Sequence, residues 1–259
     1  MKTPGSAAKS AGHRPLIQAI GLLESCFREK FGTPRQPQIA PAARAKLKIF
    51  SKFSPHHSLK GLEGFSHAWL LTYLHLNTQK MFRPSVHPPR LGGKAVGVFA
   101  SRSPHRPSPI GLSLVKIEKI AGDTIYFSGT DLVDGTPILD VKPYIPWYDR
   151  AKRALGGWAE NTPPRSLTVG FAPEALRQIE RLESSARPRL KTALGQILRQ
   201  DPRNPRDRSQ LKPDKTHEMR IWDLEVRFLV RGRRAVIESV HPAGPKDYLR
   251  PGRVPPEIL

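Results

Sequence analysis

Two short loops carry most of the side chains in this sequence that could do chemistry. The first is SRSPHRPSPIG over residues 101–111, which places Arg102, His105 and Arg106 within five residues. A guanidinium is a planar fork that suits phosphate or carboxylate groups, and the prolines restrict the backbone that carries it. The pattern indicates an anion site, with a surface loop of solvated arginines as the alternative.

The second loop is DLVDGTPILDVKPY, over residues 131–144. It supplies three carboxylates, a lysine and a tyrosine, namely Asp131, Asp134, Asp140, Lys142 and Tyr144. Such carboxylates could bind ribose hydroxyls, complement a cationic ligand such as a sulfonium, or act as a general base. Three aspartates could also hold Mg²⁺, but an Asp-Gly turn is more often structural, so we predict no metal site.

A predicted β-hairpin would hold these two loops at the same end of a sheet. Residues 112–120 alternate apolar and polar side chains, Ala121-Gly122-Asp123 forms a turn, and residues 124–130 alternate again. Functional polar groups tend to lie on such loops, because the strands beneath them are rigid.

The rest of the first half is also rich in predicted strands. Residues 62–76 fit a buried strand, with a short helix as the alternative, and on a strand His67 and His75 would share a face. Other strands are predicted over residues 16–23, 47–53 and 96–100. Four aromatic residues could stack on bases, although most strand aromatics are core, namely Trp69, Tyr73, Trp147 and Tyr148.

The chain changes character after residue 148. Residues 149–166 are polar, contain glycine and proline, and are predicted to be a linker, while residues 1–14 are a disordered basic tail. Residues 167–259 are predicted to form a small α+β unit. Its elements are helices over 173–183 and 189–200, a basic loop over 201–215, and a hairpin of residues 218–230 and 234–240.

The charge of the chain indicates a polyanionic partner. Its 259 residues include 43 Lys and Arg against 22 Asp and Glu, a net charge of +21. Nucleic acid is the first interpretation and an anionic membrane the second. No apolar run approaches the roughly 18 residues of a transmembrane helix, and the N-terminus lacks the apolar core of a secretory signal, so we expect a soluble, cytoplasmic protein without a membrane partner.

Several familiar enzyme motifs are absent from the sequence. It contains no P-loop, no Rossmann glycine fingerprint, no nucleophile elbow and no zinc-ligand spacing. The single cysteine, Cys26, excludes an intrachain disulfide and a cysteine metal cluster. The usual nucleotide enzymes are therefore not supported.

Five motifs, in this order, resemble the TsaA-like, TrmO-type family of S-adenosylmethionine-dependent tRNA methyltransferases. They are PRQP, GLEGFSHAWLL, HPPRLGG, GVFASRSPHRPSPIGLS and DLVDGTPILDVKPY. The resemblance is strong over residues 16–148 and looser beyond, through LRQDPR and WDLEVRF. It implies a mainly β N-terminal domain, a compact β-barrel methyltransferase over residues 15–148, with a small α+β C-terminal domain. It also implies a homodimer whose C-terminal domain helps to grip tRNA.

The resemblance further implies the activity and the cofactor site. The family methylates N6 of threonylcarbamoyladenosine next to the anticodon. Its S-adenosylmethionine pocket maps onto Gln36, Pro37, Gln38, His75, Leu76, Arg102, Leu112, Asp134, Gly135, Thr136 and Pro137.

Five residues are candidates for the chemistry of methyl transfer. We expect Asp140 or Tyr144 to receive the N6 proton, and Lys142 or Arg106 to neutralise the threonyl carboxylate. Ser108 stands where the family usually has asparagine in RPNPIG, and a hydroxyl offers fewer hydrogen bonds than an amide. The basic loops over residues 83–90 and 201–215 would follow the tRNA backbone.

Two other functions remain open on the same fold. One is a non-catalytic RNA-binding protein, against which tight binding of S-adenosylmethionine would argue. The other is a methyltransferase that acts on another modified nucleoside or on a small molecule. A structural basic protein, such as a ribosome-associated factor, does not explain the ordered acidic and basic loops.

Overall fold

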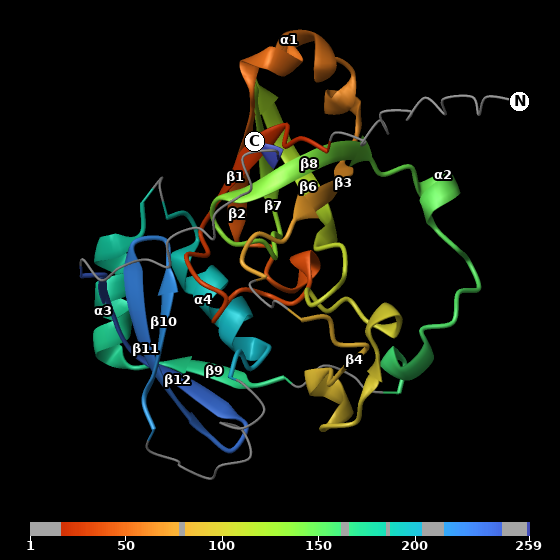
Figure 1. Cartoon of the computed structure of the whole chain (residues 1–259). Coiled ribbons are helices and arrows are strands. Elements are labelled where there is room, and N and C mark those ends of the chain that lie inside the picture. The colour runs from red at the N-terminus through yellow and green to blue at the C-terminus, as the bar shows by residue number, and fades with distance from the viewer. Residues whose placement is uncertain (1–16, 78–80, 162–165, 185–186, 204–214, 245–257) are drawn as a thin grey trace, which may run out of the picture.

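A computed structural model of the chain describes residues 17–77, 81–161, 166–184, 187–203, 215–244 and 258–259. These residues form a closed β-barrel and, beside it, a four-stranded sheet that carries two helices (Figure 1). The expected mainly β N-terminal domain with a small α+β C-terminal domain is confirmed. The predicted basic tail over residues 1–14 lies outside the described residues.

Six antiparallel strands close the barrel in the order β1-β2-β7-β6-β3-β8, and β8 pairs with β1. Every second residue of β1 and β3 is buried, because successive strand side chains point to opposite faces. The barrel interior includes Leu23, Leu47, Leu70, Ile125, Phe127 and Ile138. The strands are β1 Gly21–Ser25, β2 Arg44–Ile49, β3 His67–Tyr73, β6 Ile110–Ala121, β7 Thr124–Ser128 and β8 Thr136–Pro143.

The predicted hairpin is formed by β6 and β7. Their register pairs Ala121 with Thr124, which leaves a two-residue turn of Gly122 and Asp123. Gly122 has a φ of +60°, a left-handed conformation that favours glycine. The prediction is therefore confirmed, although β6 begins at Ile110, two residues before the predicted start.

Other strand predictions in the first half have wrong boundaries. β1 begins at residue 21, β2 ends at residue 49, and a 3-10 helix covers residues 51–53. The strand predicted over 96–100 is only β5, Val96–Gly97, paired with β4, Ser85–Val86. Apolar alternation does not show where a strand loses its pairing partner, so the pattern overestimates strand length.

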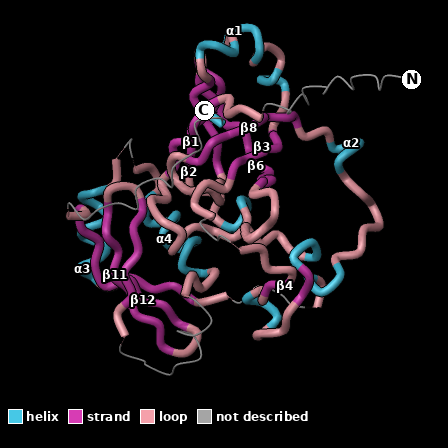
Figure 2. The backbone as a smooth tube through the Cα atoms, in the orientation of Figure 1, coloured by secondary structure: helices cyan, strands magenta, loops and turns pink. Residues whose placement is uncertain are grey.

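His75 lies outside the strand on which it was predicted. β3 ends at Tyr73, so His75 does not share a strand face with His67. The remaining short helices lie in the loops that join the strands (Figure 2). They are α1 Pro55–Ser58, α2 Pro146–Asp149 and 3-10 helices Pro37–Ile39, Leu62–Gly64, Pro89–Leu91, Val98–Ala100 and Gly157–Ala159.

The C-terminal unit, the described residues between 166 and 244, has the sheet order β10-β11-β12-β9. Its two helices are confirmed, but residues 218–230 form two strands and not one. They turn at Trp222, whose φ is +53°. Both strands alternate, but the buried positions change from odd residue numbers in β10 to even ones in β11, and the single-strand prediction did not take this change of phase into account. The elements are β9 Thr168–Phe171, α3 Pro173–Leu182, α4 Leu190–Arg199, β10 His217–Ile221, β11 Leu224–Arg231 and β12 Arg234–Pro242.

The β1–β2 segment, residues 26–43, packs into the core of the C-terminal unit. Phe27, Ala40 and Ala43 are buried in one apolar cluster with residues of α4 and β11. Phe27 also forms an isolated β-bridge with Ile221. The segment that joins two barrel strands is thus held by the other unit.

Replacing Phe27 by alanine should lower the free energy of unfolding by about 3–5 kcal/mol, because removal of a buried ring leaves a cavity. Phe27 is 1% exposed and Phe82 is 54% exposed. Phe82→Ala is therefore the matched control, with an expected change below about 0.5 kcal/mol. Urea denaturation measures both variants, and equal losses would contradict the shared core.

Candidate functional site

Four connecting segments lie at the same end of the barrel. Tyr73, at the end of β3, pairs with Ile110 at the start of β6. Thr72 pairs with Ile138, near the start of β8, while β1 runs toward this end beside the start of β8. The loop after β3, the loops before β6 and β8, and the β1–β2 segment therefore meet here.

The basic loop contacts the β1–β2 segment through a side-chain hydrogen bond. Arg102 Nη1 donates to Gln36 Oε1 at 2.5 Å. The 3-10 helix that begins at Pro37 follows directly and packs beside β6. Gly129 lets the loop before β8 approach this helix, because its φ is +69° and a Cβ there would lie 2.9 Å from Pro37 O.

The loop after β3 holds a buried imidazole with an unsatisfied nitrogen. His75 is 7% exposed, and its Nε2 has no hydrogen-bond partner among the described residues. Burial lowers the pKa of His75, although a hydrogen bond to the Tyr73 backbone opposes the shift. Buried polar atoms are normally paired, so this nitrogen fits a site that a polar ligand completes.

Polar contacts join this loop to the segments around it. Lys30 Nζ, from the β1–β2 segment, donates to the carbonyl of Leu76 at 2.6 Å. Asn77 Nδ2 donates to the carbonyl of Pro104 at 2.8 Å, and Asn77 Oδ1 lies 3.0 Å from His105 Nδ1. The loop after β3 is therefore tied to both the β1–β2 segment and the basic loop.

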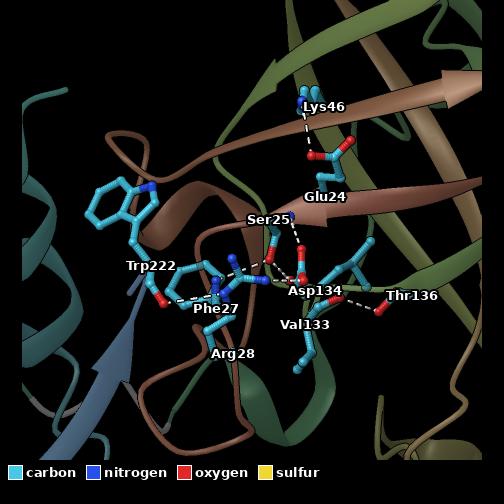
Figure 3. A network of polar contacts seen from close by, with 10 residues as sticks. Glu24, Ser25, Phe27, Arg28, Lys46, Val133, Asp134, Thr136 and Trp222 are labelled. Carbon is cyan, nitrogen blue, oxygen red and sulfur yellow. Dashed lines mark hydrogen bonds and ion pairs between the residues drawn. The ribbon is translucent and has the colours of Figure 1, made fainter. Parts of the chain in front are cut away.

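The Asp134–Pro137 turn is braced by its own aspartate (Figure 3). Asp134 Oδ1 accepts a hydrogen bond from the backbone N of Ser25 at 2.8 Å, and Oδ2 pairs with Arg28 Nη1. Gly135 takes a φ of +75°. Since both carboxylate oxygens bond within the protein, the turn offers a ligand mainly its backbone.

Asp131, in the acidic loop, bonds to β6 and lies within reach of the charge of Arg102 in the basic loop. Ser113 Oγ donates to Asp131 Oδ1 at 2.6 Å. Burial raises the pKa of Asp131 to about 6, while the Ser113 hydrogen bond and the charge of Arg102 oppose the rise. The prediction that the hairpin holds loops of opposite charge at one end of the sheet is confirmed.

Arg106 shapes the basic loop that carries it. Its Nη1 donates to the carbonyls of Ser101 at 2.8 Å and Val98 at 3.2 Å. Its guanidinium lies 5.6 Å from the centroid of the Phe99 ring, a cation–π contact. Ser108, two residues further on, is exposed.

Of the three remaining candidate residues, Asp140 and Lys142 lie on β8 and Tyr144 directly follows it, so they lie progressively further from this end. Lys142 Nζ pairs with Asp140 Oδ2 at 2.8 Å. The ring of Tyr144 meets Trp69 edge-on at 5.9 Å and lies beside His67, at the start of β3. β3 spans seven residues, so Tyr144 lies roughly 20 Å along the barrel from the loop after β3.

Four residues that shape this end carry no signal in the sequence: Arg28, Lys30, Asn77 and Ser113. Their hydrogen-bond partners lie 106, 46, 27 and 18 residues away. Local periodicity reports which face of an element is buried, and it holds no information on such distant partners.

Neither a membrane-spanning helix nor a metal-binding cluster is found in the part of the chain that the structure describes. No helix there is long and apolar enough to cross a membrane. No group of three or more His, Cys, Asp or Glu side chains there could hold a metal ion. Cys26 is buried, and burial raises the pKa of its thiol to about 12, so it is not a nucleophile at neutral pH.

Family models match both parts of the chain. The tRNA-methyltransferase O N-terminal domain matches residues 22–150, and the TrmO C-terminal domain matches residues 164–243. The chain belongs to the tRNA-methyltransferase O family. The resemblance carried by the five ordered motifs is thereby confirmed.

Individual relatives match this chain over most of its length and over most of their own. The tRNA (adenine(37)-N6)-methyltransferase of Escherichia coli K12 is 38% identical over 219 residues, which cover 83% of this chain and 92% of that protein. A Pseudomonas aeruginosa protein named "Putative S-adenosylmethionine-dependent methyltransferase RcsF" is 41% identical over 213 residues, covering 82% and 91%. The crystal structure of TrmO from Pseudomonas aeruginosa has a TM-score of 0.74 at 36% identity, covering 87% and 97%.

The raised pKa of Asp131 predicts a pH-dependent stability that Asp131→Asn should remove. The folded-state pKa of about 6 lies above the ordinary 3.8, so the folded state binds the proton more tightly. The protein should therefore lose stability as the pH rises from about 4 to about 6. Relative to the unchanged protein, the Asp131→Asn variant should gain stability over this pH window. Above about pH 6, the difference in stability between the two should stay constant. Urea denaturation measures this, and a pH-independent difference would contradict a buried carboxyl.

Proposed function

We propose that this chain transfers a methyl group from S-adenosylmethionine to N6 of threonylcarbamoyladenosine next to the anticodon of tRNA. Family membership and the names of its relatives support a tRNA methyltransferase that uses this cofactor. The observation that carries the proposal is the meeting of Gln36, Arg102, Asp131 and the Asp134–Pro137 turn at one end of the barrel.

The residues at this end have the chemistry to hold S-adenosylmethionine. A guanidinium such as that of Arg102 suits the cofactor's carboxylate, and the buried Nε2 of His75 needs a polar partner. Leu112, 55% exposed, offers an apolar contact. The cofactor supplies an electrophilic methyl group on a sulfonium. We assign its binding to Gln36, Pro37, Gln38, His75, Leu76, Arg102, Leu112 and residues 134–137.

The acceptor nitrogen is a poor nucleophile, because the ureido substituent delocalises its lone pair. The enzyme must align nitrogen, methyl carbon and sulfur, and must accept the N6 proton. We assign acceptance of the N6 proton to Asp140 or Tyr144. Lys142 or Arg106 would neutralise the threonyl carboxylate, and Ser108 lies two residues after Arg106. Because Tyr144 lies roughly 20 Å from the loop after β3, residues that follow β8 would serve the site of a second copy.

The connection after β8 supports a homodimer with such shared sites. Residues 145–157 are exposed throughout. They include Trp147, 84% exposed, Tyr148, 80% exposed, and Leu155, 91% exposed. Large apolar side chains exposed along one connection are typical of an interaction surface, which a second copy would cover.

Positive charge supports binding to the tRNA backbone. The net charge is +21. Within the basic loop over 83–90, Arg83 is exposed, while Arg90 Nη2 donates to the carbonyl of Ala159 at 2.7 Å and also helps to shape the loop. Most of the basic loop over 201–215 lies outside the described residues. Affinity for tRNA should fall steeply with salt concentration.

Arg102→Ala should raise the Kd for S-adenosylmethionine about tenfold or more, because a charge-assisted hydrogen bond is lost. Arg83→Ala is the matched control. It should leave the cofactor Kd within about twofold and instead weaken tRNA binding and reduce its salt dependence. Isothermal titration calorimetry measures the cofactor, and filter binding measures the tRNA. Normal cofactor binding by Arg102→Ala would place the cofactor elsewhere.

Nucleoside mass spectrometry tests the substrate. The purified protein should methylate tRNA that carries threonylcarbamoyladenosine and leave tRNA with unmodified adenosine at that position unchanged. Methylation of both, or of neither, would overturn the assignment.

Single replacement of Asp140, Tyr144, Lys142 and Arg106 by alanine tests their roles in the same assay. At saturating cofactor, loss of the proton acceptor should lower kcat roughly 10²-fold or more. Loss of the carboxylate partner should chiefly raise the KM for tRNA. A variant with unchanged kinetics removes that residue from the mechanism.

A further inference from the structure

The C-terminal unit holds the β1–β2 segment at several backbone positions. Trp222 N donates to the carbonyl of Cys26 at 2.6 Å. Arg220 N donates to Glu29 Oε1 at 3.0 Å. Together with the β-bridge formed by the neighbouring Phe27, these bonds fix the first part of the segment onto the turn between β10 and β11.

Two glutamines of the C-terminal unit hold the later part of the same segment. Gln200 Oε1 accepts a hydrogen bond from the backbone N of Arg35 at 3.3 Å, and Gln196 Oε1 accepts one from Ala42 N at 2.8 Å. Gln200 is 9% exposed. Arg35 directly precedes Gln36, which receives the hydrogen bond from Arg102. One proposed wall of the cofactor site is therefore attached to the end of α4.

Arg28 connects the C-terminal unit to the opposite wall (Figure 3). Its Nε donates to the carbonyl of Trp222 at 3.2 Å, while its Nη1 pairs with Asp134 Oδ2. Figure 3 shows the guanidinium between the Trp222 backbone and the carboxylate of the turn. Asp134 also accepts the hydrogen bond from Ser25 N, so the turn, β1 and the C-terminal unit form one network.

We propose that the C-terminal unit positions the cofactor site, with Arg28 and Gln200 as the positioning residues. Arg28 holds the Asp134–Pro137 turn, and Gln200 holds the loop of Gln36. Both are anchored to the same unit, so the separation of the two walls is set from outside the barrel. This role is distinct from contact with tRNA, and it rests on the proposed cofactor site.

A positioning role and a purely stabilising role make different predictions. Loss of general stability lowers the melting temperature but leaves cofactor affinity unchanged at temperatures far below it. Loss of positioning weakens cofactor binding in a folded protein, because the bound state must then order the turn itself. The response should therefore appear in the cofactor Kd and KM, with kcat at saturating cofactor retained.

Arg28→Met tests the proposal, since methionine keeps much of the stem and removes both hydrogen bonds. The Kd for S-adenosylmethionine, from calorimetry at 25 °C, should rise about tenfold, while kcat at saturating cofactor and the Kd for tRNA stay within about twofold. Arg28→Lys keeps the charge and should restore part of the affinity. The matched control is Arg227→Met on β11, which removes ion pairs to Glu218 and Glu225 within the C-terminal sheet and should leave the cofactor Kd unchanged.

Gln200→Met provides an independent test at the other wall. It removes the acceptor of the Arg35 N–H and should also raise the cofactor Kd, severalfold. If Arg28→Met proves too unstable to assay, an unchanged Kd for Gln200→Met overturns the proposal. If Arg28→Met and Gln200→Met both bind the cofactor normally while Arg102→Ala binds it weakly, the positioning role is overturned and the cofactor site stands. Normal binding by Arg102→Ala as well overturns the cofactor site on which it rests.

Discussion

The double pairing of β1 is the constraint on which the rest of the structure depends. β1 pairs with β2 along one side and with β8 along the other, and this closes the barrel. A closed barrel has no free strand edge, so each of its strands is protected from pairing with another chain. Gly21 lies at a close approach of two strands, because a Cβ there would be 2.3 Å from the carbonyl O of Lys48. The chain then passes from Ser25 straight into the core of the C-terminal unit.

Charged groups at the open end of the barrel fall into two kinds. Asp134, Arg28 and Arg106 bond to protein groups and set the shapes of loops. Asp131 and His75 instead have pKa values shifted by burial, toward the neutral forms of both side chains. Perturbed titratable groups that gather in one place are typical of functional sites. This end therefore combines a rigid charged frame with groups whose protonation a ligand can influence.

Methyl transfer places a strict demand on geometry, because the acceptor, the methyl carbon and the leaving sulfur must be aligned. Unsupported loops do not hold such an alignment well, but here the barrel and the C-terminal unit both anchor them. Strands of the barrel fix one end of each loop, while α4 and the turn between β10 and β11 fix the β1–β2 segment from outside. Through these contacts, the C-terminal unit restrains the segment that carries Gln36.

The sequence by itself determined the ordered motifs, the β6–β7 hairpin and the two C-terminal helices. Strict alternation and a Gly-Asp turn are local properties, as is the apolar spacing of α3 and α4. The turn at Trp222 was missed because the residues on both sides of it alternate, although the alternation changes phase there. Only the tertiary structure decided that the Asp134 carboxylate pairs with Arg28, that Tyr144 lies far from the loop after β3, and that residues 26–43 belong to a second core. Each of these depends on groups tens of residues apart or more, whose meeting is set by strand register and by which unit buries each segment. Local periodicity encodes neither.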